Sequence, residues 1–183
     1  MGLFDFGKKK KNDNKKFLLQ WQNFLLEKDG HNPSKELFFS KEDLERYTLT
    51  DVKLFTGIIE DCKKAINETV NPSVFFSRLN LLIQRAEQLR MYEPYAEFPN
   101  GNPSDIYSET VNQYHEITFK FLKRSLANTI EKSDAMKTPK GKINKFHNWY
   151  ESLKEYYPYM NEKNIHFLES EYQLHTNKLT PKS

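Results

Sequence analysis

The sequence predicts an all-α fold: a single bundle-like domain of about six helices, preceded by a short, flexible, basic N-terminal tail. The chain has only 6 Gly and no strong alternation of β-branched residues, so strands are not expected. Hydrophobic residues make up a low 37%, but 14 Phe, 10 Tyr and 2 Trp supply large side chains for a core. Apolar residues recur at helical spacing along most of the chain, which favours packed helices.

The stretch from residue 71 to residue 92 carries the clearest helix pattern. Asn71 is expected as the N-cap, with Pro72 at the first helical position, where a missing N–H costs nothing. Two neighbouring rows recur at steps of three and four: Phe75, Leu79, Leu82, Ala86 and Leu89, and then Phe76, Ile83 and Arg90. So broad a stripe predicts a helix packed on two sides, at the centre of the domain.

The N-terminal segment has an unusual charge pattern. Residues 1–16 carry six Lys against two Asp, a formal charge of +4, whereas the remainder carries −1. We expect a tail over 1–16, a helical domain over 17–176 and a frayed end over 177–183. The tail predicts peripheral contact with an anionic membrane through its apolar tip and its lysines: Leu3, Phe4, Phe6, Lys8, Lys9, Lys10 and Lys11. The alternative is a disordered, solubilising segment.

A first helix is expected from Phe17 to Lys28, with an apolar face along one side. That face comprises Phe17, Leu18, Trp21, Phe24 and Leu25. Such a stripe is typical of a core helix. If it were exposed, then Phe17, Trp21, Phe24 and Leu25 would form a docking face for a partner.

The stretch from residue 40 to residue 70 predicts two helices. Ser40 and Asp43 are spaced as a weak capping box for a short helix, and Thr48 or Thr50 would cap a longer one that ends near Val70. Its buried stripe is Val52, Phe55, Ile59, Cys62 and Ile66. Cys62 is therefore expected in the core. Because it is the single cysteine of the chain, no internal disulfide can form, which favours an intracellular protein.

The segment from residue 92 to residue 107 is a loop rich in Pro, Gly and Asn, with Tyr95 and Phe98 inside it. These aromatic side chains would either line a groove for a peptide or small ligand, or pin the loop to the domain. The second interpretation is favoured.

Three further helix starts carry a capping residue: Asn102 before Pro103, Thr138 before Pro139, and Asn161. We expect the helix that starts at Pro103 to run unbroken to about Asp134, and the helix that starts at Pro139 to stop at Pro158. Their apolar stripes are Tyr107, Val111, Tyr114, Ile117, Phe121, Leu122 and Ile130; then Ile143, Phe146, Tyr150, Leu153 and Tyr157; and, in the last helix, Ile165, Leu168, Tyr172 and His175.

No residue pattern points to catalysis, a metal or a cofactor. The five histidines do not fall three or four residues apart, no second cysteine is present, and no Gly-rich phosphate loop occurs. No apolar run of about 18 residues could span a membrane. The apolar residues of the N-terminus precede its lysines, the reverse of a secretory signal. We therefore expect a non-enzymatic cytoplasmic protein, with peripheral attachment at the inner face of the membrane as a variant.

A lysine-rich helix start is the best candidate for nucleic-acid contact in the body of the chain. Its lysines are Lys137, Lys140, Lys142 and Lys145. The near-neutral body argues against this role, because phosphate binding needs a basic face.

The phrase NPSVFFSRLNLLIQRAEQL, the long Tyr/Phe helix that follows and KTPKGKINKF together resemble an uncharacterised all-helical domain. That domain occurs in small proteins of Gram-positive bacteria and their mobile elements, and the resemblance covers about residues 36–172. The start MGLFDFGKKKK also resembles those of bacterial cytoplasmic and membrane-associated proteins. The resemblance implies a helical fold and no activity. The leading hypothesis is a helical interaction module that binds an unidentified protein or itself.

Overall fold

The computed structural model describes residues 3–98 and 101–179, with side chains from residue 14 onward. Within these residues the chain is helical and has no strand, so the all-α prediction is confirmed. The elements are α1 (Leu3–Lys28), α2 (Lys41–Glu68), α3 (Pro72–Arg90), α4 (Pro103–Asn112), α5 (Tyr114–Asp134), α6 (Pro139–Lys154), the 3₁₀ turn η1 (Tyr157–Tyr159) and α7 (Glu162–Leu179).

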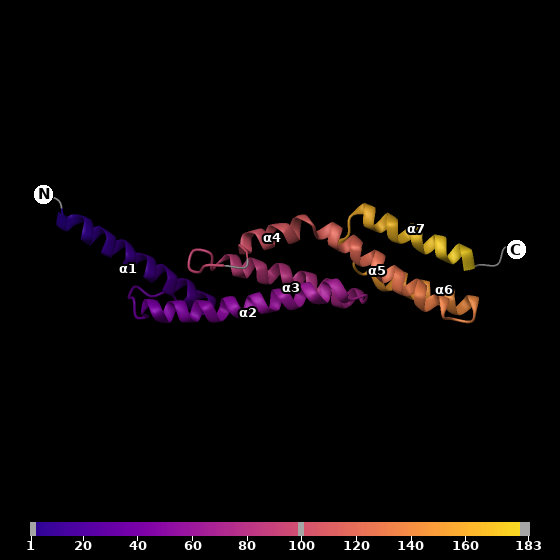
Figure 1. Cartoon of the computed structure of the whole chain (residues 1–183), viewed down its shortest axis with the longest axis horizontal. Helices are drawn as coiled ribbons and strands as arrows, with labels where there is room; N and C mark the ends of the chain where they lie inside the picture. Colours follow the sequence, from indigo (N-terminus) through magenta and orange to yellow (C-terminus); the bar gives the residue numbers. More distant parts are fainter. Residues whose placement is uncertain (1–2, 99–100, 180–183) are drawn as a thin grey trace.

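The helices form an elongated molecule in which two helical groups lie end to end along the long axis (Figure 1). Helices α2 and α3 lie antiparallel with α4 on α3, and α5, α6 and α7 pack together at the other end. Helix α4 leads into α5 and so connects the two groups. Helix α1 rests on α2 through its second half, and its first half leaves the body.

Five of the predicted capping residues begin their helices as expected. Ser40 and Asp43 form a complete capping box, since each side chain bonds the other residue's backbone N–H. The other four caps accept hydrogen bonds from free N–H groups in the first turn: Asn71, Asn102, Thr138 and Asn161. Local side-chain chemistry therefore sets these five starts.

Several predicted boundaries are wrong. Helix α2 is unbroken from Lys41 to Glu68, because neither threonine acts as a cap: Thr48 is buried and accepts a hydrogen bond from Trp21, and Thr50 donates to the carbonyl of Arg46. Helix α1 begins at Leu3 rather than at Phe17.

The expected long helix over residues 103–134 is also wrong, since it divides at Gln113 (φ −93°, ψ 5°). No Pro or Gly causes the break. Instead α4 packs on α3, whereas α5 packs on α6 and α7, and the two partners require different axes. Helix α6 ends at Lys154, ahead of Pro158, which lies within η1.

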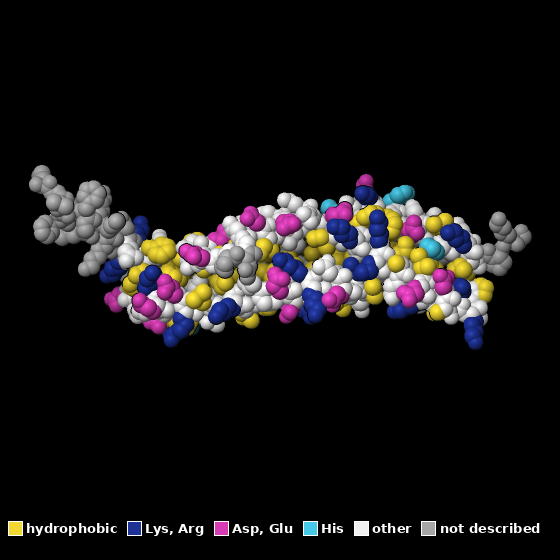
Figure 2. All heavy atoms as spheres, viewed as in Figure 1, with side chains coloured by type: hydrophobic (Ala, Val, Ile, Leu, Met, Phe, Trp, Pro, Cys, Tyr) yellow, Lys and Arg dark blue, Asp and Glu magenta, His cyan; other side chains and the backbone are white. Residues whose placement is uncertain are grey.

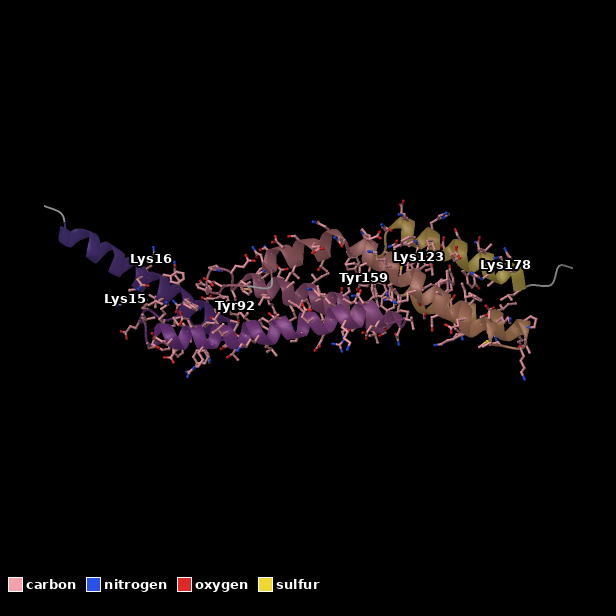
Figure 3. The ribbon with its side chains drawn as sticks, in the orientation of Figure 1. Lys15, Lys16, Tyr92, Lys123, Tyr159 and Lys178 are labelled. Carbon is pink, nitrogen blue, oxygen red and sulfur yellow. The ribbon has the colours of Figure 1, made fainter. Side chains whose placement is uncertain are left out.

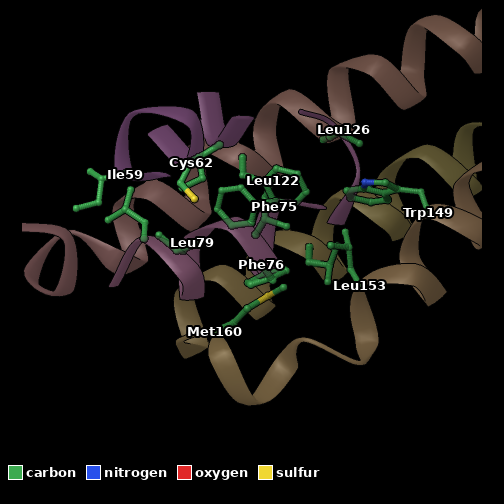
Figure 4. Close-up of a cluster of buried hydrophobic side chains, with 14 of the residues drawn as sticks. Ile59, Cys62, Phe75, Phe76, Leu79, Leu122, Leu126, Trp149, Leu153 and Met160 are labelled. Atoms are coloured by element: carbon green, nitrogen blue, oxygen red, sulfur yellow. The ribbon is translucent and has the colours of Figure 1, made fainter. Parts of the chain in front are cut away.

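One large core joins the two groups. Phe75 of α3 stacks on Phe121 of α5 with ring centroids 4.0 Å apart, and both rings are fully buried. Figure 4 shows Phe76 near Met160, with Trp149 and Leu153 of α6 completing the far side. Helix α3 contacts both α2 and α4, in agreement with its broad apolar stripe. The stripe ends early, because Arg90 is exposed and lies over the ring of Tyr107 at 4.8 Å.

Polar contacts from α5 reinforce the joint between the groups. The guanidinium of Arg124 donates to the carbonyls of Ile66 (2.6 Å) and Thr69 (2.9 Å), which lie at the C-terminal end of α2. Ser125 donates to the carbonyl of Val70 at 3.1 Å and accepts a hydrogen bond from Trp149. These bonds satisfy carbonyls that the end of a helix leaves free.

A second, smaller core fixes α1 to the body. Its buried members are Trp21, Leu25, Leu44 and Tyr92. It lies at the end of the molecule from which α1 departs.

Candidate functional site

The proposed partner face on α1 is mostly internal. Trp21 is 3% exposed and Leu25 is 5% exposed, and Trp21 Nε1 donates to Thr48 Oγ1 at 2.9 Å. Phe24 is half-buried, and its ring meets Tyr92 edge-on at 5.0 Å. Only Phe17, which is 38% exposed, offers substantial apolar surface. The core interpretation of this stripe is therefore correct, and a docking face made of all four residues is not available.

Two amide side chains, which the sequence reasoning missed, hold the second half of α1 in place. Gln22 is fully buried, and its amide donates to the carbonyl of Glu36 and accepts from the N–H groups of Phe38 and Phe39. Asn23 exchanges two hydrogen bonds with the backbone of Ser34. An analysis based on apolar periodicity does not identify polar residues such as these. The one sequence feature that could have indicated their burial is that they directly follow Trp21 on the same helix.

A charged network also holds this end together. Asp51 on α2 accepts a hydrogen bond from the hydroxyl of Tyr92 at 2.7 Å and pairs with Lys28 at 2.6 Å. Burial, with the carboxylate of Asp51, raises the pKa of Tyr92. Burial alone would lower the pKa of Lys28, but its bonds to Asp29 and Asp51 outweigh that effect, and the net direction is upward. The network is structural, since it links α1, α2 and the end of α3.

The loop after α3 is pinned at both of its ends. Tyr95 stacks on Trp21 with centroids 5.5 Å apart and on Phe24 at 5.2 Å. The carboxylate of Glu93 accepts two hydrogen bonds from Ser104, at 2.7 Å from its N–H and at 3.0 Å from its hydroxyl. Tyr95 therefore fastens the loop to the domain, as favoured, and Tyr95 and Phe98 also line surface hollows, as in the alternative interpretation.

A groove nevertheless remains between α2 and this loop, and we call it the loop groove. It consists of two hollows of about 550 Å³ and about 430 Å³, which share Leu49 and Glu97 as lining residues. Its apolar lining comes mainly from α2 and the loop, with Leu49, Val52, Ile59, Tyr95 and Phe98. Helix α1 adds Phe17 and Trp21, and α3 and α4 add Leu89 and Ile106. Leu49 is 50% exposed, which makes it the most open apolar side chain of that lining. Figure 2 shows hydrophobic side chains at the surface near the end where α1 leaves the body.

Charges around the loop groove are mainly acidic. Four glutamates line it against two lysines: Glu45, Glu60, Glu93 and Glu97, with Lys41 and Lys53. The surrounding residues 17–112 contain 10 Lys and Arg against 15 Asp and Glu, a formal charge of −5. Residues 113–183 contain 12 against 8, a formal charge of +4. Residues 1–16 carry +4, so the acidic stretch that contributes most of the groove is flanked in sequence by two basic stretches. Figure 3 labels four of the flanking lysines: Lys15 and Lys16 on α1, Lys123 on α5 and Lys178 on α7.

The remaining predicted sites occupy separate places. The side chains of Leu3, Phe4, Phe6 and Lys8–Lys11 lie outside the described residues. Lys137 and Lys140 are exposed at the start of α6, whereas Lys142 and Lys145 are half-buried. Cys62 is fully buried as predicted, and burial raises the pKa of its thiol, against a smaller opposing influence from Arg78.

In the part of the chain that the structure describes, no three His, Cys, Asp or Glu side chains gather so as to hold a metal ion. None of the helices in that part combines the length and apolarity needed to cross a bilayer.

Comparison of the chain with protein-family models, with curated proteins and with solved structures finds no match to any of them. The resemblance to a helical domain of Gram-positive bacteria therefore stays a prediction.

Proposed function

We propose that this chain is a non-enzymatic helical interaction module that receives an amphipathic helix in the loop groove. The observation that carries the proposal is the groove itself: an apolar floor on α2, with Leu49 half exposed, between charged margins. Such a floor with a polar rim suits the helix-in-groove mode of recognition, in which apolar anchors enter and charges set the partner's direction. The single core shared by α2–α7 supports treating the body as one domain.

Site-specific photo-crosslinking in the native cells tests this proposal. A photoreactive amino acid replaces Leu49 in the intact chain. The matched control carries it at Leu54, which lies on the same helix and is 57% exposed but does not line the groove. We expect discrete covalent adducts from position 49 and none of the same mass from position 54.

Equal adducts from both positions would indicate random collision rather than a binding groove. The absence of adducts at position 49, with intact folding by circular dichroism, would contradict the proposal. Fractionation of the same cells checks the predicted cytoplasmic location. The chain and its adducts should then appear in the cytosolic fraction and not in the membrane fraction.

The second candidate function is peripheral attachment to an anionic membrane. The course of α1 favours it, because residues 3–13 continue the helix past the docked half and away from the body (Figure 1). Their sequence places three apolar residues before four lysines, and both features suit an anionic bilayer surface. Sedimentation with phosphatidylserine vesicles tests this role. Binding that is unchanged when Lys8–Lys11 are replaced by Glu would rule out this mechanism.

A further inference from the structure

We infer that the helix received by the loop groove is the N-terminal segment, residues 3–16, of a second copy of this chain, and that two copies exchange these segments reciprocally. The inference rests on the proposed function, because it names the occupant of the groove. Four observations support it: the continuity of α1, the length of the segment, the apolar lining and the distribution of charge.

The segment cannot occupy the groove of its own chain. Helix α1 runs without interruption from Leu3 to Lys28, and its second half is fixed by the amides of Gln22 and Asn23. A continuous helix cannot fold back, so residues 3–16 follow the axis of the docked half away from the body (Figure 1). Only another molecule can bring this sequence to the groove.

The segment is short enough to lie within the groove. Residues 3–16 form a helix of about 21 Å at 1.5 Å per residue. The lining of the groove on α2 extends from Lys41 to Glu60, which corresponds to about 29 Å along the axis of that helix. A docked segment would therefore cover most of the groove.

The chemistry of the two surfaces is complementary. The segment supplies Leu3, Phe4 and Phe6, and the groove presents an apolar floor built around Leu49. The segment carries a formal charge of +4, and the groove is lined by four glutamates against two lysines. Glu97 is exposed on the loop wall shared by both hollows and is the best placed of the glutamates to meet a lysine. Opposite charges at the margin favour encounter and register, while the apolar contacts supply most of the affinity.

Reciprocal exchange closes the assembly. The segment is the first half of α1, and Phe17 and Trp21 of the same helix line one hollow of the groove. A two-fold axis near this end of the molecule can therefore place each segment in the other copy's groove. The contact is then made twice, which doubles the buried area relative to one helix in one groove. The α5–α7 groups point outward at the two ends of the dimer.

Sedimentation velocity of the purified intact chain tests the inference. We expect a monomer–dimer equilibrium. A groove variant, Leu49→Glu, and a tip variant, Phe4→Ser with Phe6→Ser, should each weaken the dimer by about tenfold or more, as loss of a central anchor does. The control Leu54→Glu introduces the same charge outside the groove and should leave the dimer unchanged. Circular dichroism verifies the fold of each variant.

Mixing the two variants gives the decisive measurement. Dimers of either variant alone have both contacts impaired. A mixed dimer regains one intact contact, because the groove variant keeps a normal tip and the tip variant keeps a normal groove. We expect the mixture to dimerise more tightly than either variant by itself. A variant that merely misfolded could not be rescued in this way.

A chain that stays monomeric, or a dimer that ignores both variants, would overturn the inference. So would a mixture no tighter than its components. These failures differ from failure of the proposed function: a monomeric chain that still gives adducts at position 49 in cells has a groove with another occupant. A chain that gives no adducts has neither.

Discussion

Replacement of Gln22 by Ala should detach the second half of α1 more effectively than loss of any exposed residue on that helix. Gln22 is fully buried and makes three hydrogen bonds to the backbone of residues 36–39. The substitution removes all three and leaves two N–H groups and one carbonyl without their partner. Gln22 therefore stabilises the fold through hydrogen bonds to the backbone of the segment between α1 and α2, and not through apolar packing as a core leucine does.

The expected loss follows from the bonds. A net contribution of about 1 kcal/mol for each gives about 3 kcal/mol, and a freed group that stays buried adds about 1–3 kcal/mol. Phe38 is 59% exposed, so water reaches part of the freed backbone and limits that addition. We therefore expect a loss of about 3 kcal/mol, a large share of the roughly 5–15 kcal/mol that stabilises an ordinary domain.

Two measurements check this value. Urea unfolding followed by circular dichroism gives the free energy of unfolding for the native chain and the variant. Hydrogen exchange gives a local readout, since the amides of Phe38 and Phe39 donate to Gln22 and should lose protection. Gln20→Ala is the control, because Gln20 is exposed on the same helix and its loss should cost at most about 0.5 kcal/mol.

An equal effect of Gln22→Ala and Gln20→Ala on the free energy of unfolding, with protection kept at both amides, would refute this reasoning. It would mean that the aromatic contacts of Trp21 hold α1 and that the amide bonds add nothing.

Three further predictions follow from other contacts. Arg124→Met should lower the free energy of unfolding by about 2–3 kcal/mol in urea titrations, because the guanidinium hydrogen bonds to the carbonyls at the end of α2 are lost. Lys123→Met, at an exposed position, is the control, and an equal effect of the two substitutions would contradict this prediction. The pKa values of Tyr92 and Lys28 are raised in the folded state, so the free energy of unfolding should fall as pH rises above about 10. Tyr92→Phe should make that fall shallower in urea midpoints measured at alkaline pH. An unchanged pH profile would show that the Tyr92–Asp51–Lys28 network does not contribute to stability. If the start of α6 binds nucleic acid, then Lys137→Glu with Lys140→Glu should weaken filter binding of DNA and reduce its salt dependence; unaltered binding would end that hypothesis.

The helix starts show how far sequence reasoning reached. Asn71 before Pro72 and the Ser40–Asp43 pair were predicted and confirmed, because a cap satisfies N–H groups within its own turn. The division at Gln113 had no such local signal, since it follows from the different packing partners of α4 and α5. Thr48 was taken for a cap because its buried partner, Trp21, lies 27 residues away.

The candidate site shows the same division more sharply. The stripe through Trp21 and Leu25 identified an apolar face, but periodicity alone could not say whether the chain itself or a partner covers it. The structure covers it with α2 and Tyr95, and leaves half exposed Leu49, which belonged to no predicted stripe, beside Val52 and Ile59, which did.

The helical class, most of the capped helix starts, the buried side of most helices and the basic N-terminal segment could all be read from the amino-acid sequence. Each of these depends on residues within one or two turns, where hydrogen bonding and periodicity act locally. In contrast, which apolar face stays open, and where the acidic groove lies relative to α1, depend on how the helices pack. Those features arise where side chains distant in sequence, such as Trp21, Leu49 and Tyr95, meet after the helices have packed.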